Sequence, residues 1–325
     1  MNYFLGIDGG QSHTTALIAD GNGRILGWGG AGACNHTREP GGRERLITAV
    51  TKSVDEALER AGLKTAPKGG TAKFKFASAH LAMCGEPEYK IDIVNELLRA
   101  EHLVVGHDAP GGLAGALAGG EGVIVLAGTG SVACGETADG RLVRVGGHGY
   151  MFGDEGSAYG ITCDAMRVAL ALQDRGTPGA LNDELLAHFK FSSLKEIAEE
   201  FYAGLLSRDR LASFAAKVSK VAGRKDPAAI EVLDVAAEAL AALAIACVNR
   251  LGGRALKVSY GGGVFKSRLI LNAFAEMVLD ELPDAEIVAP RFKSEVGALL
   301  LAYRQAGKKI TPKLLANITE TQTTK

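Results

Sequence analysis

Two short glycine-containing segments have the composition of phosphate-binding turns. Residues 8–12 read Asp-Gly-Gly-Gln-Ser, and residues 128–131 read Gly-Thr-Gly-Ser. Glycine lets backbone N–H groups point at an anion with no Cβ in the way, and a hydroxyl side chain adds a further donor. The Asp8 carboxylate could in addition hold Mg²⁺, which keeps part of its water shell and bridges phosphates. Each segment alone is explained equally well as an ordinary hairpin turn, but the two together favour phosphate binding.

Asp108 is a second candidate for chemistry. It follows an apolar run at residues 103–106 and precedes Ala109 and Pro110. A carboxylate at the end of a strand can act as a general base that takes a proton from an attacking hydroxyl group. The same pattern is typical of a helix N-cap with proline in the first turn. The two interpretations are compatible, so Asp108 is a candidate catalytic residue.

The segment 146–156 is too rich in glycine for a core strand and too apolar for a linker. Its acidic pair, Asp154 and Glu155, precedes an expected helix and could simply favour the positive end of that helix. The alternative is a loop whose carboxylates accept hydrogen bonds from sugar hydroxyls. Asn35 and His36, which follow another glycine-rich stretch, could also contact a ligand, although such a pair is ordinary in loops.

A third glycine cluster, at residues 261–263, ends an expected strand, and Ser267 lies near the start of the next helix. Three glycines would allow close approach of a flat ring such as adenine. They are equally consistent with a tight turn between strand and helix.

The elements expected around these residues form a weak internal repeat. Apolar runs at residues 4–8 and 123–127 predict buried strands that lead into the two glycine turns. After each turn come a second strand, an Asp-Gly-containing turn and a third strand. The two copies lie about 120 residues apart, which indicates a duplicated α/β domain.

Elsewhere the pattern predicts a helix at residues 89–100, a strand at 103–106 and a helix at 211–222. The polar segment after Lys308 is expected to be a loose tail.

Several other functions are excluded by the sequence. The net charge of −1 and the aromatic content of 6% argue against nucleic-acid binding. A Walker P-loop needs a Gly-Lys-Ser/Thr triplet, which is absent. Residues 128–133 match the dinucleotide fingerprint formally, but the chain continues into an Asp-Gly turn instead of opening a helix.

The cysteines and the N-terminus indicate an intracellular protein. The five cysteines are widely spaced and form no C-x-x-C motif, so we expect reduced thiols in a cytoplasm and no zinc or iron–sulfur site. The first residues have no basic region of a signal peptide, and no apolar stretch is long enough to span a membrane.

In chain order the segments DGGQSHTT, ACNH, HDAPG, LAGTGS, GGHGYMFGDEGSAYGI and GGGVFKS together resemble the BadF/BadG/BcrA/BcrD-type ATPase family. The resemblance runs from about Tyr3 to Tyr303, and within the family it is closest to the N-acetylglucosamine kinases. It implies the actin/hexokinase/Hsp70 fold, with two related ribonuclease H-like α/β lobes around a cleft.

The resemblance also implies an activity: transfer of phosphate from ATP, with Mg²⁺, to the 6-hydroxyl of an amino sugar such as N-acetylglucosamine. Asp108 matches the catalytic base, and Asp8 matches the residue that serves the metal. Nucleotide contacts are implied at Asp8, Gly9, Gly10, Ser12, Thr129, Gly130, Gly262, Gly263 and Ser267. Sugar contacts are implied at Asn35, His36, Asp108, Ser131, Gly147, His148, Gly149 and Asp154.

Two residues depart from the family pattern. Gln11 stands where the family usually has glycine, and His148 stands where an aromatic residue is common. Glucosamine or N-acetylmuramate therefore stays open as the substrate. A sugar sensor without catalysis and an ATPase that activates a partner stay open as other functions, although scattered cysteines argue against the iron–sulfur activators of this family.

We expect a first lobe at residues 1–110, completed by a C-terminal helix at 294–308, a second lobe at 111–293 with a helical insertion, and a flexible tail at 309–325. Related kinases are often homodimers, so a homodimer is possible here, and no membrane or nucleic-acid partner is expected.

Overall fold

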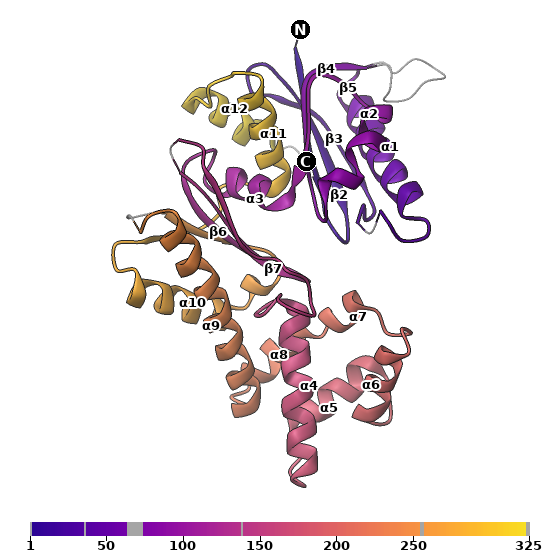
Figure 1. Cartoon of the computed structure of the whole chain (residues 1–325), viewed down its shortest axis with the longest axis vertical. Coiled ribbons are helices and arrows are strands. Elements are labelled where there is room, and N and C mark those ends of the chain that lie inside the picture. Colours follow the sequence, from indigo (N-terminus) through magenta and orange to yellow (C-terminus); the bar gives the residue numbers. More distant parts are fainter. Residues whose placement is uncertain (1, 36, 64–73, 138, 254–256, 323–325) are drawn as a thin grey trace. The chain divides into compact units, whose positions relative to one another are not determined.

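The computed structural model describes residues 2–35, 37–63, 74–137, 139–253 and 257–322 (Figure 1). Contacts within the chain divide it into two compact units. Unit 1 comprises Met1–Gly120 and Ala289–Lys325, and unit 2 comprises Glu121–Val288. From the sequence, the lobe boundaries were predicted at residues 110 and 293.

Unit 1 contains a five-stranded sheet in the order β3-β2-β1-β4-β5. Strands β1 (Tyr3–Gly9), β2 (Thr14–Asp20) and β3 (Ile25–Ala31) form an antiparallel meander. Strands β4 (Lys75–Met83) and β5 (Arg99–His107) continue the sheet in parallel with β1.

Helices cover both faces of this sheet. Because side chains alternate along a strand, Leu5 and Ile7 of β1 pack in one apolar cluster with α1 (Gly42–Arg60). Phe4 points to the other face, where its ring lies 4.4 Å from that of Tyr303 in α11 (Ser294–Gln305). Helix α3 (Asp108–Ala116) packs beside α11.

Unit 2 repeats the same sheet topology, in the order β10-β9-β6-β7-β8. Strands β6 (Gly122–Ala127), β7 (Ser131–Glu136) and β8 (Leu142–Gly146) are antiparallel. Strands β9 (Lys257–Gly261) and β10 (Glu286–Val288) run parallel to β6. The duplicated α/β fold predicted from the sequence is confirmed.

Helices make up the rest of unit 2. The long α9 (Pro227–Arg250) and α10 (Arg268–Glu281) pack against each other, and α9 also contacts β6 and β7. The other helices are α4 (Ala158–Asp174), α5 (Ala180–Phe189), α6 (Leu194–Tyr202), α7 (Arg208–Ala212) and α8 (Ala215–Ala222). The single helix predicted at residues 211–222 is therefore wrong, because the chain turns at Ser213 and Phe214.

Two further sequence predictions differ from the structure. The helix expected at residues 89–100 is a 3-10 turn (Pro87–Tyr89) followed by the short α2 (Ile91–Leu97). Strand β5 begins already at Arg99, because residues 99–107 pair along nearly the whole of β4. The strand expected at residues 103–106 is thus the second half of a longer one.

The C-terminal segment is helical, so the prediction of a loose tail is wrong. Helix α12 spans Pro312–Gln322, and it buries Leu314, Leu315 and Ile318 against the core that contains Phe4. These three residues share one face of a helix, and this apolar stripe outweighs the polar composition of the segment.

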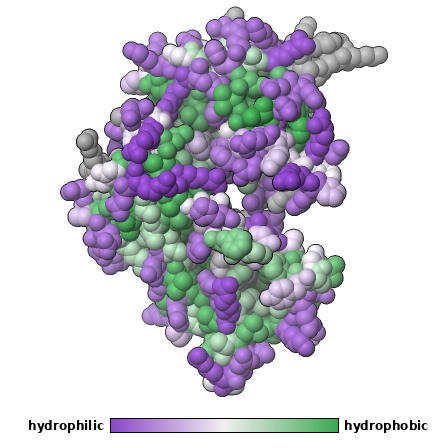
Figure 2. All heavy atoms as spheres, in the orientation of Figure 1, coloured by the Kyte–Doolittle hydropathy of each residue, from purple (hydrophilic) through white to green (hydrophobic). Residues whose placement is uncertain are grey.

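None of the helices in the described ranges is long and apolar enough to cross a membrane. On the face drawn in Figure 2, hydrophilic and hydrophobic residues are interspersed over each unit. All five cysteines are free thiols, as the sequence predicts.

Two glycines allow α11 to touch the backbone of its neighbours. A Cβ atom at Gly297 would lie 1.7 Å from the carbonyl oxygen of Gly111 in α3. A Cβ atom at Gly6 would lie 2.3 Å from the amide nitrogen of Leu299. Backbone atoms cannot yield as a flexible side chain can, so helix α11 fits between β1 and α3 only with glycine at both positions.

We predict that Gly297→Ala destabilises the protein by about 1–3 kcal/mol, because overpacking pushes α11 away from α3. The measurement is the free energy of unfolding in urea. Gly30→Ala is the matched control, since a Cβ at Gly30 meets no atom within 4 Å. Equal stability of the two variants would contradict the close-packing argument.

Candidate functional site

The turn after β1 has the geometry of a tight hairpin. The amide of Gly10 donates to the carbonyl of His13 at 2.9 Å, and the amide of Cys34 donates to the carbonyl of Gly10 at 3.3 Å. A Cβ at Gly9 would lie 2.6 Å from the Cys34 sulfur, so this position also favours glycine. The structure therefore supports the turn predicted at residues 8–12.

The unusual Gln11 does not block this turn. Its side-chain amide nitrogen lies 3.6 Å from the sulfur of Cys84, just after β4, while the neighbouring Ser12 is exposed. The extra bulk at position 11 is thus accommodated beside Cys84, and the hydroxyl of Ser12 is available to a ligand.

The register of the parallel strands brings Asp108 close to this turn. Gly9 is opposite Met83, and Met83 is opposite His107, so the carboxyl ends of β1, β4 and β5 meet at one edge of the sheet. Asp108 follows His107 directly and is the first residue of α3. The interpretation of Asp108 as the N-cap is wrong, because His107 occupies that position, with no capping hydrogen bond from its side chain.

Asp8, Asp108 and Glu295 form a group of carboxylates in unit 1. Burial first, and then the negative charges of Glu295 and Asp108, together raise the pKa of Asp8 to about 7. Glu295, in the first turn of α11, was not singled out from the sequence; a glutamate at a helix start looks like an ordinary dipole-compensating residue.

This group fits a hydrated Mg²⁺ better than a fully protein-bound metal. Among the residues that the structure describes, no three His, Cys, Asp or Glu side chains converge closely enough to hold a metal ion. Mg²⁺ characteristically takes one or two carboxylates and completes its shell with water and phosphate oxygens. Asp8 could supply such a carboxylate, and a cation there would offset the mutual repulsion.

A buried lysine also lies near this edge of the sheet. Lys90 is 1% exposed, and its Nζ donates a hydrogen bond to the carbonyl of Cys84. Burial lowers the pKa of Lys90, whereas negative charge nearby, including that of Asp108, raises it. Asn35 is also buried, at 7% exposure, and His36 lies outside the described residues.

In unit 2 the turn at residues 128–131 is held against the start of α4. The amide of Ala158 donates to the carbonyl of Gly128 at 2.8 Å, and the hydroxyl of Ser131 donates to the carbonyl of Glu155 at 2.7 Å. The Thr129 hydroxyl donates to the carboxylate of Asp209 at 3.3 Å. The turn is therefore part of a rigid local structure and not a free loop.

Asp154 lies under this turn. Its Oδ1 accepts from the amide of Ser131 at 3.2 Å, and its Oδ2 pairs with Nη2 of Arg208 at 3.3 Å. Its side chain is 6% exposed, and its φ of 64° is left-handed, which is uncommon for a residue other than glycine. The helix N-cap is Ser157, whose side chain accepts from the amide of Gly160, so the carboxylate of Asp154 does not cap this helix.

The loop before Asp154 runs over the surface of unit 2. Gly147 and Gly149 have φ values of 68° and 84°, a conformation that favours glycine. His148 is exposed, and at the tip of the loop Met151 and Phe152 are 70% and 80% exposed. The loop is therefore accessible to a ligand.

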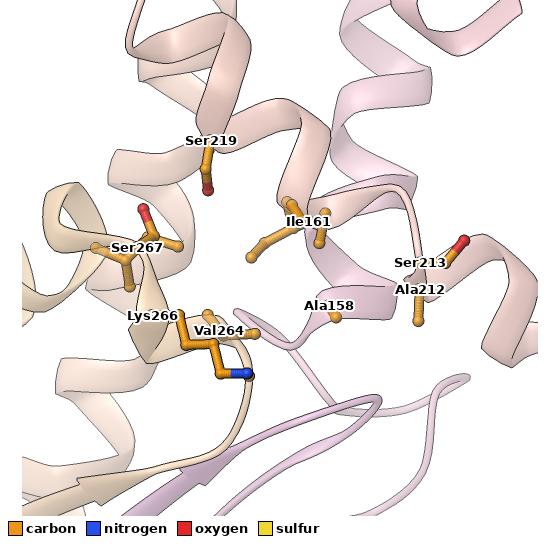
Figure 3. A pocket seen from close by; sticks show the side chains of 12 residues that line it. Ala158, Ile161, Ala212, Ser213, Ser219, Val264, Lys266 and Ser267 are labelled. Atoms are coloured by element: carbon orange, nitrogen blue, oxygen red, sulfur yellow. The ribbon is translucent and has the colours of Figure 1, made fainter. Parts of the chain in front are cut away.

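A cavity of about 410 Å³ opens beside the turn (Figure 3). Ala158, which bonds to the turn, lines one wall, and the sequence-predicted Gly263 and Ser267 line another. Gly262 has a φ of 95°, and a Cβ there would lie 2.2 Å from the Ala127 carbonyl. The other lining residues are Ile161, Ala212, Ser213, Ala215, Ala216, Ser219, Val264, Lys266 and Ile270.

Most of these lining residues were not predicted, because small and apolar residues on helices look like ordinary core. The structure places Gly263 and Ser267 together with residues of α7 and α8 that carry no motif. The break between α7 and α8 at residues 213–214, which brings them together, is seen only in the structure, because the sequence predicts one helix over residues 211–222.

The sequence profile of the BadF/BadG/BcrA/BcrD ATPase family matches residues 5–302. The chain belongs to this family. The match covers both sheets and every predicted site residue, so the family assignment applies to both units.

Two curated relatives are amino-sugar kinases. An N-acetylmuramic acid/N-acetylglucosamine kinase from Clostridium acetobutylicum is 26% identical over 311 residues, which cover 93% of this chain and 98% of the relative. The glucosamine kinase GspK of Vibrio cholerae is 27% identical, and the match covers 93% of this chain and 96% of the relative.

Solved structures show the same fold. A Chromobacterium violaceum protein proposed to be an N-acetylglucosamine kinase has a TM-score of 0.76 at 26% identity, with 93% of this chain and 99% of that one covered. A ROK-family glucokinase from Streptomyces griseus has a TM-score of 0.58 at 18% identity, with 93% and 100% covered. The fold is thus the actin/hexokinase type expected from the sequence.

We predict that, without metal, the wild type loses stability as the pH rises from about 4 to 7. The folded protein keeps a proton on Asp8 up to pH about 7, whereas the unfolded chain releases it near its ordinary pKa of 3.8, so the folded state binds more protons in this interval. Asp8→Asn removes this contribution. The gain in Tm of Asp8→Asn over the wild type, measured in EDTA, is therefore larger at pH 8 than at pH 5.

Glu121→Gln is the control, because Glu121 is exposed. A gain in Tm that is the same at both pH values would show that Asp8 does not titrate in this range.

Proposed function

We propose that the protein transfers the γ-phosphoryl group of ATP to the 6-hydroxyl of an amino sugar, with N-acetylglucosamine as the first candidate. One observation carries this proposal: Ala158 lines the cavity, and its amide also donates a hydrogen bond to the carbonyl of Gly128 in the turn at 128–131. A nucleoside in the cavity would have its phosphates beside backbone amides and the Thr129 hydroxyl. The amino-sugar kinases among the relatives support the acceptor class.

In this reaction the sugar oxygen forms a bond to the γ-phosphorus while the bond between that phosphorus and the bridging oxygen of ADP breaks. Asp108 accepts the proton of the sugar hydroxyl. Mg²⁺, held at Asp8, would offset the charge of the phosphates. The turn at residues 8–12 supplies amide donors and the Ser12 hydroxyl to the phosphate oxygens, and the turn at 128–131 supplies amide donors.

The acceptor loop, defined as residues 147–154, is proposed to bind the sugar together with Asn35, His36 and Ser131. Asp154 has both carboxylate oxygens engaged, by Ser131 and Arg208, but each carboxylate oxygen can accept a second hydrogen bond. Asp154 can therefore bind a sugar hydroxyl while it still holds the turn.

We predict that the wild type releases ADP from Mg-ATP only in the presence of an amino sugar. Release is measured with N-acetylglucosamine, glucosamine, N-acetylmuramate and glucose. Asp108→Asn lowers kcat by about 10²–10⁴-fold, because it cannot take the proton. Asp92→Asn, an exposed residue of α2, is the control.

Absence of sugar-stimulated turnover by the wild type across this panel would refute the proposal. Strong ATP hydrolysis without sugar would instead favour an ATPase that activates a partner, and sugar binding without turnover would favour a sensor.

A second prediction concerns the cavity. Ala216 is an exposed residue of α8 that lines it, so Ala216→Leu narrows the space for a nucleoside. We expect the KM for ATP to rise at least several-fold, while the Tm changes little because Ala216 is not in the core. Ala216→Ser, which barely changes the volume, serves as control; an unchanged KM in the leucine variant would place the nucleoside elsewhere.

A further inference from the structure

Arg208 makes an unusual combination of contacts in unit 2. From the first turn of α7, its Nη2 pairs with Oδ2 of Asp154 at 3.3 Å. The centre of its guanidinium group lies 4.3 Å from the centroid of the Tyr150 ring and 5.4 Å from that of Tyr159. Its Nε is buried and has no hydrogen-bond partner among the described residues.

Through these contacts Arg208 touches the acceptor loop at its middle and at its C-terminal end. Tyr150 lies in the middle of that loop, and Asp154 ends it. Asp154 is also fixed to the turn at residues 128–131. The amide of Ser131 donates to its Oδ1, and a Cβ at Gly130 would lie 2.8 Å from that oxygen. A movement of Arg208 would therefore shift both the acceptor loop and the turn at residues 128–131.

The helix that carries Arg208 also reaches the cavity. Asp209, the next residue, accepts a hydrogen bond from Thr129 at 3.3 Å. Ala212 and Ser213, at the end of the same helix, line the cavity, as Figure 3 shows. Helix α7 thus contacts the acceptor loop and the turn at residues 128–131, and it lines part of the cavity.

Arginine suits this position for physical reasons. Its planar guanidinium can stack on an aromatic ring and donate hydrogen bonds in its own plane at the same time. A lysine would keep the charge near Asp154 but could not make both contacts in the same geometry. The strained φ of Asp154 is the kind of feature that persists where surrounding contacts hold it, and Arg208 is one of those contacts.

We propose that Arg208 is a positioning residue that couples binding of the amino sugar at the acceptor loop to binding of the nucleotide in the cavity. This inference rests on the function proposed above. A nucleotide that contacts Ala212, Ser213 and Thr129 stabilises α7 in one position, and Arg208 then holds Tyr150 and Asp154 in the conformation that binds sugar. By linkage, the sugar tightens nucleotide binding by the same factor.

The test is the Kd of N-acetylglucosamine, or of glucosamine if the wild type prefers it, with and without saturating Mg-ADP. Isothermal titration calorimetry measures it for the wild type, Arg208→Met, Arg208→Lys and Arg210→Met. Arg210→Met is the matched control, because Arg210 lies in the same helix but donates to the carbonyl of Phe189.

In the wild type we expect Mg-ADP to tighten sugar binding by about 5-fold or more. The ratio falls to about 1 in Arg208→Met, takes an intermediate value in Arg208→Lys, and stays at the wild-type value in Arg210→Met. A purely structural role would lower the Tm of Arg208→Met and leave the ratio unchanged, so the Tm of each variant is measured alongside. Should Arg208→Met fail to fold, Arg208→Lys, which keeps the charge, decides the question in the same assay.

A wild-type ratio of 1 would overturn the inference, and so would an undiminished ratio in folded Arg208→Met or, where only that variant folds, in Arg208→Lys. Failure of the proposed function appears differently. In that case the wild type turns over no sugar of the panel. The coupling role then fails as well, and this is already seen in the wild type without any comparison of variants.

Discussion

The parallel register of β1, β4 and β5 is the constraint on which the chemistry of unit 1 depends. Because Gly9, Met83 and His107 are aligned, each strand ends at the same edge of the sheet. The residues that follow the three strands, Gly10, Cys84 and Asp108, therefore lie close together because of the strand pairing alone. A slip of one residue would turn the side chains of a strand to the opposite face, and both apolar clusters oppose such a slip.

This convergence has an electrostatic cost. Partial burial and the neighbouring Glu295 and Asp108 hold Asp8 in its protonated form up to pH about 7, which an isolated carboxyl at the surface would not be. The fold tolerates the cost because α11, which carries Glu295, is fixed by backbone contact at Gly297 and Gly6. A cation at this edge would relieve the repulsion, which is consistent with the magnesium role proposed for Asp8.

Sequence reasoning predicted the two sheets and their glycine turns, because local patterns encode them. Alternating apolar strands, Asp-Gly turns and glycines with a hydroxyl neighbour are readable over a few residues. Gly263 and Ser267, predicted as nucleotide contacts, line the cavity, and their role there stays a prediction. Sequence reasoning failed for α12, whose polar composition hid a short apolar stripe, and for β5, whose length depends on pairing with a strand about 25 residues away.

The residues it missed share a different property: their role comes from partners distant in sequence. The charge of Glu295 acts on Asp8, nearly 290 residues away in the chain. Arg208 contacts Asp154 and Tyr150, which lie more than 50 residues before it. Nothing in the local sequence distinguishes these residues from ordinary charged residues at helix starts. Only the fold shows which of the many charged side chains interact with a buried charged residue.

The helices of unit 2 therefore do more than extend the sheet. The acceptor loop is rich in glycine and has an exposed tip, so few core contacts of its own fix its conformation. Its fixed points are the edge-to-face contact of Tyr150 with Tyr159, at a ring distance of 5.4 Å, and the contacts of Arg208. Both come from helices that also line the cavity. In such an arrangement, the loop that would bind the acceptor takes its order from the same helices that would bind the nucleotide.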